Sequence, residues 1–266
     1  LTLARKSVTF EKDSHLMPRF LFLLLLFATA CSSSPSSSEP ATSPLADETP
    51  VSEVVENTAA LPTHQQILLS VTENWDAVPG KLYQLEWADD QYHILDPEGI
   101  DMVVGKKGLA WGRGLQDYRD RQGPVKQEGD KKSPAGVFRL GTAFGYASAE
   151  EASFIKTDYT HVIHSTMCIE DISSGSYNQI IDEGDAPADW NSTDHMLRKD
   201  DLYEWGMFVL HNQPEPEGGS GSCIFLHVWR ENDSGTAGCT AMDKGKMKGL
   251  LGWFDPAKQP ILLQLP

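Results

Sequence analysis

A histidine and a cysteine near the C-terminus have the residue types and the spacing of a base and a thiol nucleophile. His227 ends the apolar run 224–227, and Cys239 follows a glycine in the segment 236–240, twelve positions later. A thiol is a weak nucleophile until a neighbouring imidazole takes its proton or stabilises the thiolate. A strand that carries the histidine and a turn that carries the cysteine can bring the two together. The pattern therefore indicates a cysteine enzyme of acyl transfer.

The residues around Cys239 are suited to bind a developing negative charge. Gly238 allows the backbone to approach a ligand closely or to adopt a positive φ. A helix is predicted to start just after the turn, at about Asp243. The backbone amides of Gly238, Cys239 and Thr240 are then predicted to form an oxyanion hole. The alternative is that Cys239 is a small buried apolar residue, as free cysteines often are.

A metal site is the second interpretation of the same region. His164, Cys168, Cys223 and His227 offer two imidazoles and two thiols, which zinc accepts. Their spacing is looser than that of a zinc knuckle, and a disulfide would compete for the two cysteines in an oxidising compartment. No metal is therefore predicted. No cofactor is predicted either, because the thiol itself supplies the covalent chemistry.

Residues 1–31 are predicted to be a signal peptide, and Met17 is a candidate for the natural start. A basic residue, Arg19, precedes the apolar run 20–27, which is shorter than the roughly 20 apolar residues that span a bilayer. Cys31 follows Ala-Thr-Ala, and this stretch resembles the lipobox of bacterial lipoproteins. Cys31 is therefore expected to carry a lipid; a plain signal peptide is the alternative. The Ser- and Pro-rich residues 32–63 are expected to form a disordered tether.

Residues 64–266 are predicted to form one domain. The chain has a formal net charge of −16, which argues against nucleic acid or anionic membrane surfaces as partners. Three cysteines follow Cys31, and an odd number suggests one disulfide and one free thiol. Cys168–Cys223 is the favoured pair, with both thiols free as the alternative.

The domain is predicted to be mainly β, with a few short helices. Apolar and β-branched runs alternate with Gly, Pro and Asp, and predict these strands: 67–72, 81–87, 91–94, 101–105, 136–140, 207–210, 223–229 and 261–265. A short helix is predicted at 148–152 with Ser148 as its cap, and a longer one at 243–254 with Asp243 as its cap. The Gly-rich segment 218–222 precedes a strand rather than a helix, so it is read as a flexible loop and not as a phosphate site.

Several blocks together resemble the L,D-transpeptidase (YkuD-type) catalytic domain. They are 219–227, 236–242, Lys126-x-Glu128-Gly129-Asp130 with 133–138, Asp171-x-x-Ser174-x-x-Tyr177-Asn178, Asp189-Trp190-x-Ser192 and His211-Asn212. The resemblance implies a β-rich enzyme that remodels peptidoglycan, with Cys239 as nucleophile and His227 as base. It also implies that His211, Gly219, Gly221, Ser222 and Thr236 lie near the substrate. Much of the family has Ser-His-Gly-Cys where this chain has Thr236-Ala237-Gly238-Cys239, so the second histidine has no counterpart here.

The expected function is therefore acyl transfer from the third residue of a peptidoglycan stem peptide to an amine. Hydrolysis of the same thioester, by a carboxypeptidase or an amidase, is the first alternative. A non-enzymatic wall-binding lipoprotein is the second. The expected partners are stem peptides and, through the lipid on Cys31, a membrane. Ser32 follows the lipid cysteine and favours the outer membrane, facing the periplasm.

Overall fold

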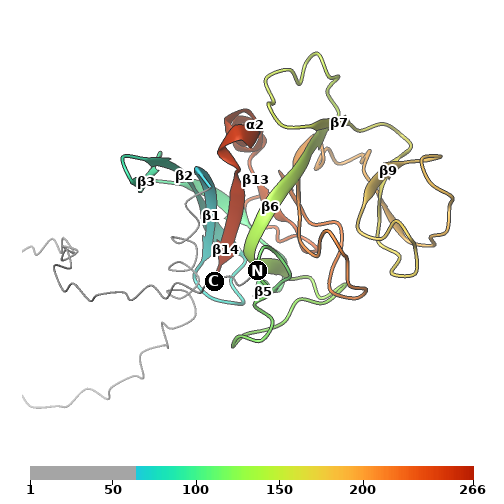
Figure 1. Cartoon of the computed structure of the whole chain (residues 1–266), viewed down its shortest axis with the longest axis horizontal. Coiled ribbons are helices and arrows are strands. Elements are labelled where there is room, and N and C mark those ends of the chain that lie inside the picture. The colour runs from blue at the N-terminus through green and yellow to red at the C-terminus, as the bar shows by residue number, and fades with distance from the viewer. Residues whose placement is uncertain (1–63) are drawn as a thin grey trace, which may run out of the picture. The chain divides into compact units, whose positions relative to one another are not determined.

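The computed structural model describes residues 64–266, so the predicted signal peptide, its Cys31 and the tether 32–63 lie outside the described residues. The described part is mainly β, as predicted, and its largest unit is an 11-stranded sheet (Figure 1). The strands follow the order β1 (Gln66–Thr72), β14 (Ile261–Leu265), β6 (Ser133–Gly145), β11 (Trp205–Val209), β12 (Phe225–Val228), β13 (Thr240–Met242), β4 (Ile100–Val103) and β2 (Pro79–Ala88). Because β1 pairs with β2 as well as with β14, this path closes into a barrel.

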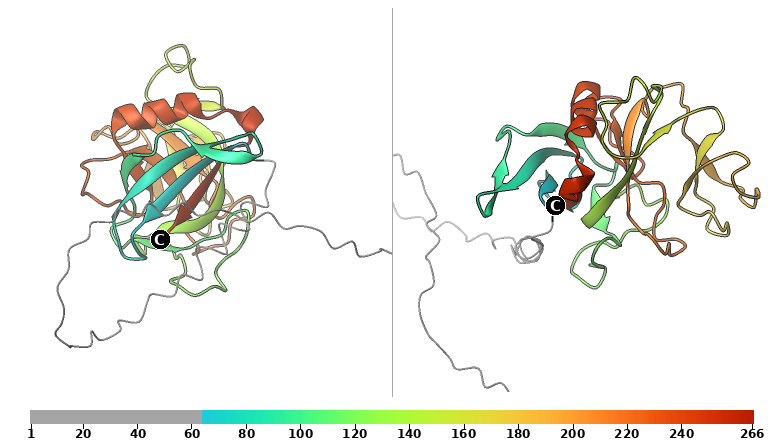
Figure 2. Two further views of the ribbon diagram at one scale, coloured as in Figure 1. Left: turned by 90° about the vertical axis from the view of Figure 1, so that its left-hand side faces the viewer. Right: turned by 45° about the horizontal axis from the view of Figure 1, so that its top comes forward.

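Shorter strands extend the barrel on two sides. β3 (Gln91–Ile94) forms a hairpin with β2, while β5 (Leu109–Trp111) and β7 (Tyr159–His161) pair with β6. A separate three-stranded sheet consists of β10 (Thr193–His195), β8 (Thr166–Ile169) and β9 (Ile180–Asp182). This small sheet lies on the far side of β6 from the β2–β3 hairpin (Figures 1 and 2).

The predicted C-terminal helix is confirmed as α2 (Lys244–Trp253). Asp243 caps it, because its side chain accepts hydrogen bonds from the backbone amides of Gly245 and Lys246. Met247, Leu250 and Leu251 are buried, so the apolar face predicted from their spacing packs on the barrel core. The one-turn 3₁₀ helix η1 (Pro256–Lys258) follows, and the chain then returns as β14.

The predicted helix at 148–152 is wrong. Ser148 and Glu151 do form the reciprocal hydrogen bonds of a capping box, and the amide of Ala152 donates to the carbonyl of Ser148 at 2.9 Å. The segment nevertheless makes only turns. One capped turn fixes several backbone angles for very few hydrogen bonds, so it does not propagate without further helix-compatible packing.

A buried polar network ties the barrel strands together in the interior. Gln264 on β14 accepts hydrogen bonds from the hydroxyls of Ser70 on β1 and Thr240 on β13, at 2.9 and 2.8 Å. Its side-chain amide donates to the carbonyl of Pro134 on β6 at 2.8 Å. Since each partner is satisfied, the network can be buried without an unpaired polar group.

A disulfide joins the small sheet to the barrel. Cys168 on β8 is bonded to Cys223, which directly precedes the buried residues Ile224 and Phe225. The favoured pairing is therefore present, and Cys239 is the free cysteine of the described chain. The alternative zinc site is wrong, because Cys168 and Cys223, two of its four proposed ligands, are joined in this disulfide. Cys223 also has a φ of +52°, so the predicted strand 223–229 shortens to β12.

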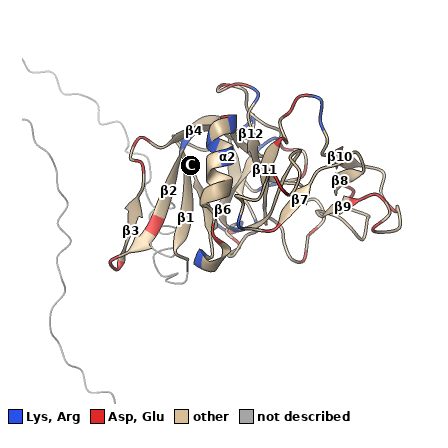
Figure 3. Cartoon of the chain, turned by 90° about the horizontal axis from the view of Figure 1, so that it is seen from above, with Lys and Arg blue, Asp and Glu red and all other residues tan. Residues whose placement is uncertain are grey.

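The described domain is acidic. Residues 64–266 contain 18 Lys and Arg against 31 Asp and Glu, and in Figure 3 the ribbon positions of the acidic residues are red. No helix within residues 64–266 has the length and apolar character needed to cross a membrane.

Candidate active site

Two neighbouring parallel strands bring His227 and Cys239 to one face of the barrel sheet. In the β12–β13 pair, Leu226 lies beside Thr240 and His227 beside Ala241. Cys239 directly precedes β13, and the amide of Phe225 donates to its sulfur at 3.3 Å. Cys239 and Ala241 are two residues apart, so their side chains share a face, and Ala241 is the register partner of His227. The imidazole and the thiol therefore point to the same side.

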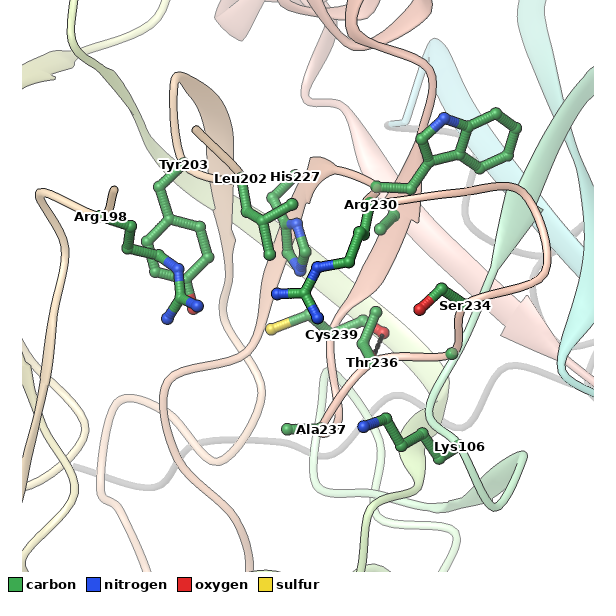
Figure 4. Close-up of a pocket in the computed structure, with 13 residues that line it drawn as sticks. Lys106, Arg198, Leu202, Tyr203, His227, Arg230, Ser234, Thr236, Ala237 and Cys239 are labelled. Atoms are coloured by element: carbon green, nitrogen blue, oxygen red, sulfur yellow. Dashed lines mark hydrogen bonds between the residues drawn. The ribbon is translucent and has the colours of Figure 1, made fainter. Parts of the chain in front are cut away.

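His227 and Cys239 line one pocket of about 210 Å³ (Figure 4). The side chains that surround them come from three loops and from the two strands: Lys106, Arg198, Leu202, Tyr203, Trp229, Arg230, Ser234, Gly235, Thr236, Ala237 and Ala241. His227 is 5% exposed and Cys239 7% exposed, so a small opening gives access to both.

The orientation of the His227 ring is fixed from two sides. Its Nδ1–H donates to the carbonyl of Val228 at 2.7 Å, which leaves the lone pair on Nε2. The ring of Tyr203 packs against it edge to face, with centroids 5.3 Å apart. The Tyr203 hydroxyl in turn donates to Asp194 at 2.5 Å. Nε2 is therefore the atom of His227 that can accept a proton.

Burial keeps both reactive groups neutral. It raises the pKa of the Cys239 thiol to about 12, against a smaller opposite effect from the Phe225 amide that points at the sulfur. It lowers the pKa of His227 to about 4. The resting site thus holds a thiol and an uncharged imidazole rather than a preformed ion pair. Proton transfer must accompany the attack on a substrate.

The turn before Cys239 is held by two hydroxyl groups that both bond to the Cys239 carbonyl. Thr236 Oγ1 donates to it at 2.5 Å, and Ser133 Oγ donates to it at 2.7 Å. Ser133 also accepts the amide of Gly105 at 2.8 Å, and is fully buried. Thr236 was predicted to lie near the substrate, and it does line the pocket, but its hydroxyl is engaged within the turn.

Only one of the three predicted oxyanion-hole amides is unengaged. The amide of Gly238 donates to Thr236 Oγ1 at 3.1 Å. The amide of Trp229, just after β12, donates to the carbonyl of Met242 on β13 at 2.8 Å. Hydrogen bonds alternate in direction along a parallel pair of strands, so the amide of Thr240 points toward β12. Among residues 64–266, no acceptor is found for the amide of Cys239. This N–H is therefore the donor best placed for a developing oxyanion.

His211 does not reach the pocket, contrary to its predicted role near the substrate. It is 1% exposed, and its Nε2–H donates to the carbonyl of Ser220 at 2.8 Å. Nδ1 is buried without a hydrogen-bond partner, and burial lowers the pKa of His211 to about 4. His211 is therefore a structural histidine that packs against Gly112 and the Phe138 ring.

The Gly-rich loop is also outside the pocket, and it is tied down rather than flexible. The Gly219 carbonyl accepts the amide of Glu128 at 2.8 Å, and the Gly221 carbonyl accepts Asn212 Nδ2 at 3.0 Å. Ser222 donates to Glu128 Oε2 at 2.8 Å. Gly219, Gly221 and Ser222 are therefore held by Glu128 and Asn212 and are not among the residues that line this pocket.

Sequence reasoning missed the charged side chains of the pocket. Lys106, Arg198 and Arg230 come from loops distant in sequence, and none belongs to a recognisable motif. Tyr203 also lines the pocket, and no sequence motif singles it out.

Within residues 64–266, no group of three or more His, Cys, Asp and Glu side chains is arranged to hold a metal ion. Comparison of the chain with models of protein families, with curated proteins and with solved structures finds no match.

Proposed function

We propose that this protein is a peptidoglycan L,D-transpeptidase of the YkuD type, acting through the Cys239 thiol. The observation that carries the proposal is that Cys239 and His227 line one pocket, beside a Cys239 amide without an acceptor in the described chain. The resemblance of the blocks around them supplies the substrate class. The mainly β fold agrees with that resemblance but is shared by many unrelated functions.

The chemistry follows from the neutral resting pair. His227 Nε2 takes the thiol proton as Cys239 Sγ attacks the carbonyl of the third stem-peptide residue. The new oxyanion accepts a hydrogen bond from the Cys239 amide. The carbonyl then re-forms as the terminal D-residue leaves, and its amine takes the proton from His227. An amine of a neighbouring stem then attacks the thioester, releases the thiol and forms the cross-link. No step requires a cofactor.

The test is turnover of muropeptides by purified protein, with products identified by mass. Cys239→Ala and His227→Gln should each reduce turnover by at least ~100-fold. His211→Gln is the matched control, because it changes a histidine of similar burial outside the pocket. Persistent turnover by Cys239→Ala would remove the mechanism.

The product mass also separates the acceptors. Joined stems identify a transpeptidase, whereas trimmed stems identify a carboxypeptidase that transfers the same acyl group to water. The resemblance further predicts covalent modification of Cys239 by a carbapenem. Absence of both turnover and modification in folded protein would favour a wall-binding role without catalysis. The proposed lipid on Cys31 would hold the domain at the periplasmic face of the outer membrane.

A further inference from the structure

The pocket around Cys239 is cationic within an acidic domain. Lys106, Arg198 and Arg230 line it, and none of its described lining residues is Asp or Glu. The described domain nevertheless has 31 acidic side chains against 18 basic ones. A cluster of cations at this one place is therefore opposite to the overall charge of the domain, and indicates an anionic ligand group.

The acidic residues behind the pocket balance only part of this charge. Asp200 lies 2.8 Å from an Arg198 nitrogen and 2.9 Å from an Arg230 nitrogen, so one carboxylate serves two guanidinium groups. The same arginines hold the pKa of Asp200 at about 2, with Arg198 as the main cause. Asp194 lies farther from Arg198, at 3.6 Å, and burial raises its pKa.

Lys106 has no carboxylate partner among the described residues. Its backbone is nonetheless fixed beside the reactive turn, because its amide donates to the carbonyl of Thr236 at 2.9 Å. Figure 4 shows its ammonium group and the Arg230 guanidinium entering the pocket from different sides, with the Cys239 side chain nearby. Two cations from separate loops thus face the space that a substrate of Cys239 must occupy.

We propose that Lys106, with Arg230, forms a carboxylate-binding subsite, and that the acyl donor must present a free carboxylate there. This proposal rests on the proposed function for the identity of the donor, in which the departing D-residue carries such a carboxylate. A hydrogen bond between an ammonium and a carboxylate is charge-assisted, and is stronger than one between neutral groups. The subsite therefore selects stems with a free end over stems whose end is amidated or extended.

A pair of matched alkylating reagents tests the subsite without using turnover. N-iodoacetyl-D-alanine and its carboxamide place the same carbon before the thiol and differ in one carboxylate. In both, Sγ displaces iodide and the thiol proton leaves with the base. The readout is the ratio of the two alkylation rates at Cys239, with the modified residue identified by mass. A change in thiol reactivity affects both rates equally, so it does not change the ratio.

Lys106→Met should lower the acid-to-amide ratio by about two- to fivefold, since Lys106 is exposed and an ion pair made by an exposed lysine contributes up to about 1 kcal/mol. Arg230→Met should lower it less, because Arg230 shares Asp200. Lys107→Met is the matched control: it removes the adjacent lysine, which is exposed like Lys106 but does not line the pocket, and should keep the ratio of the unmodified protein. Lys106→Arg should retain most of the preference. Equal ratios in Lys106→Met and the unmodified protein would overturn the proposal.

Stem tetrapeptides ending in a carboxylate or a carboxamide extend the test to the donor. The unmodified protein should use the acid better by about two- to fivefold or more, and Lys106→Met should lose most of that preference. If neither peptide is turned over, the proposed function fails while the alkylation ratio still decides the subsite. If both peptides are used equally well, the subsite fails while the proposed function stands.

Discussion

Cys239 and His227 meet in a place where water is scarce, and this determines how the pair can work. Burial raises the pKa of the thiol to about 12 and lowers that of the imidazole to about 4, so neither group is charged at neutral pH. Alkylation by a small neutral reagent such as iodoacetamide depends on the thiolate fraction. That fraction should rise about tenfold for each pH unit between pH 7 and 10, without a plateau.

The measurement is the rate of iodoacetamide modification of Cys239 against pH, followed by intact mass. Glutathione is the reference thiol, whose rate should level off near its ordinary pKa of roughly 8.5–9. A rate for Cys239 that is already constant at pH 7 would instead show a preformed thiolate–imidazolium pair. It would contradict the proposal that the proton moves to His227 during the attack.

Sequence alone identified the two reactive residues but not their neighbours. His227 and Cys239 lie on adjacent segments of one motif, and local spacing carries enough information to pair them. His211 could not be separated from a substrate-contacting histidine, because its burial depends on Gly112 and Phe138, which lie 99 and 73 positions earlier in the chain. The positions of Lys106 and Arg230 in the pocket could not be predicted either, because they also depend on contacts between distant parts of the sequence. They become neighbours only when the chain folds.

At the scale of elements, β6 and the turn before β13 fix the backbone of the nucleophile. Ser133 at the start of β6 donates to the Cys239 carbonyl and accepts the Gly105 amide. Ser133→Ala should destabilise the fold by roughly 1–3 kcal/mol, because it leaves a buried amide unpaired. It should also slow alkylation of Cys239, since the turn loses one of its two hydroxyl contacts.

Ser70→Ala is the matched control for that prediction. Ser70 is equally buried and donates to Gln264, but it has no contact with the turn. Urea unfolding should show a loss of similar size for the two variants, while alkylation slows in Ser133→Ala alone. Equal alkylation rates in the two variants would show that Ser133 is a core residue without a positioning role.

The longer elements were predictable because each contains its own pattern. The strand 261–265 and the helix capped by Asp243 follow directly from apolar spacing and capping chemistry. The three-residue strands β5, β7, β9, β10 and β13 could not be predicted, because so short a segment is defined by its partner strand. At 148–152 the local capping pattern was right, but no packing carried the helix beyond one turn.

At the scale of the whole molecule, buried histidines make stability depend on pH. His211 has a pKa of about 4 when folded, against 6.5 in its unperturbed state. The unfolded chain therefore binds more protons between pH 6.5 and 4, and the stabilisation present above pH 6.5 is lost as the pH falls through that window. Urea unfolding of His211→Gln should show a slope shallower by about 1.4 kcal/mol per pH unit. Parallel curves for variant and parent would contradict this assignment.

The disulfide connects the small sheet to the barrel, and the reactive thiol lies at their junction. Cys168 and Cys223 close a segment of 55 residues, and Cys239 packs in the same apolar cluster as both. Closing a loop of this size stabilises a fold by about 4 kcal/mol in the chain-entropy treatment. Reduction should therefore lower the free energy of unfolding by roughly 2–5 kcal/mol.

The loss should be concentrated in the small sheet, because the barrel strands are paired independently of the disulfide. Hydrogen exchange after reduction should accelerate across 166–195, which contains the three strands of the small sheet, and β1 and β14 should remain protected. The experiment belongs in Cys239→Ala protein, because the Cys239 sulfur lies 3.6 Å from the Cys223 carbonyl oxygen and its thiol could exchange with the disulfide. Uniform acceleration across the barrel would mean that the two sheets unfold as one unit, and would contradict this prediction.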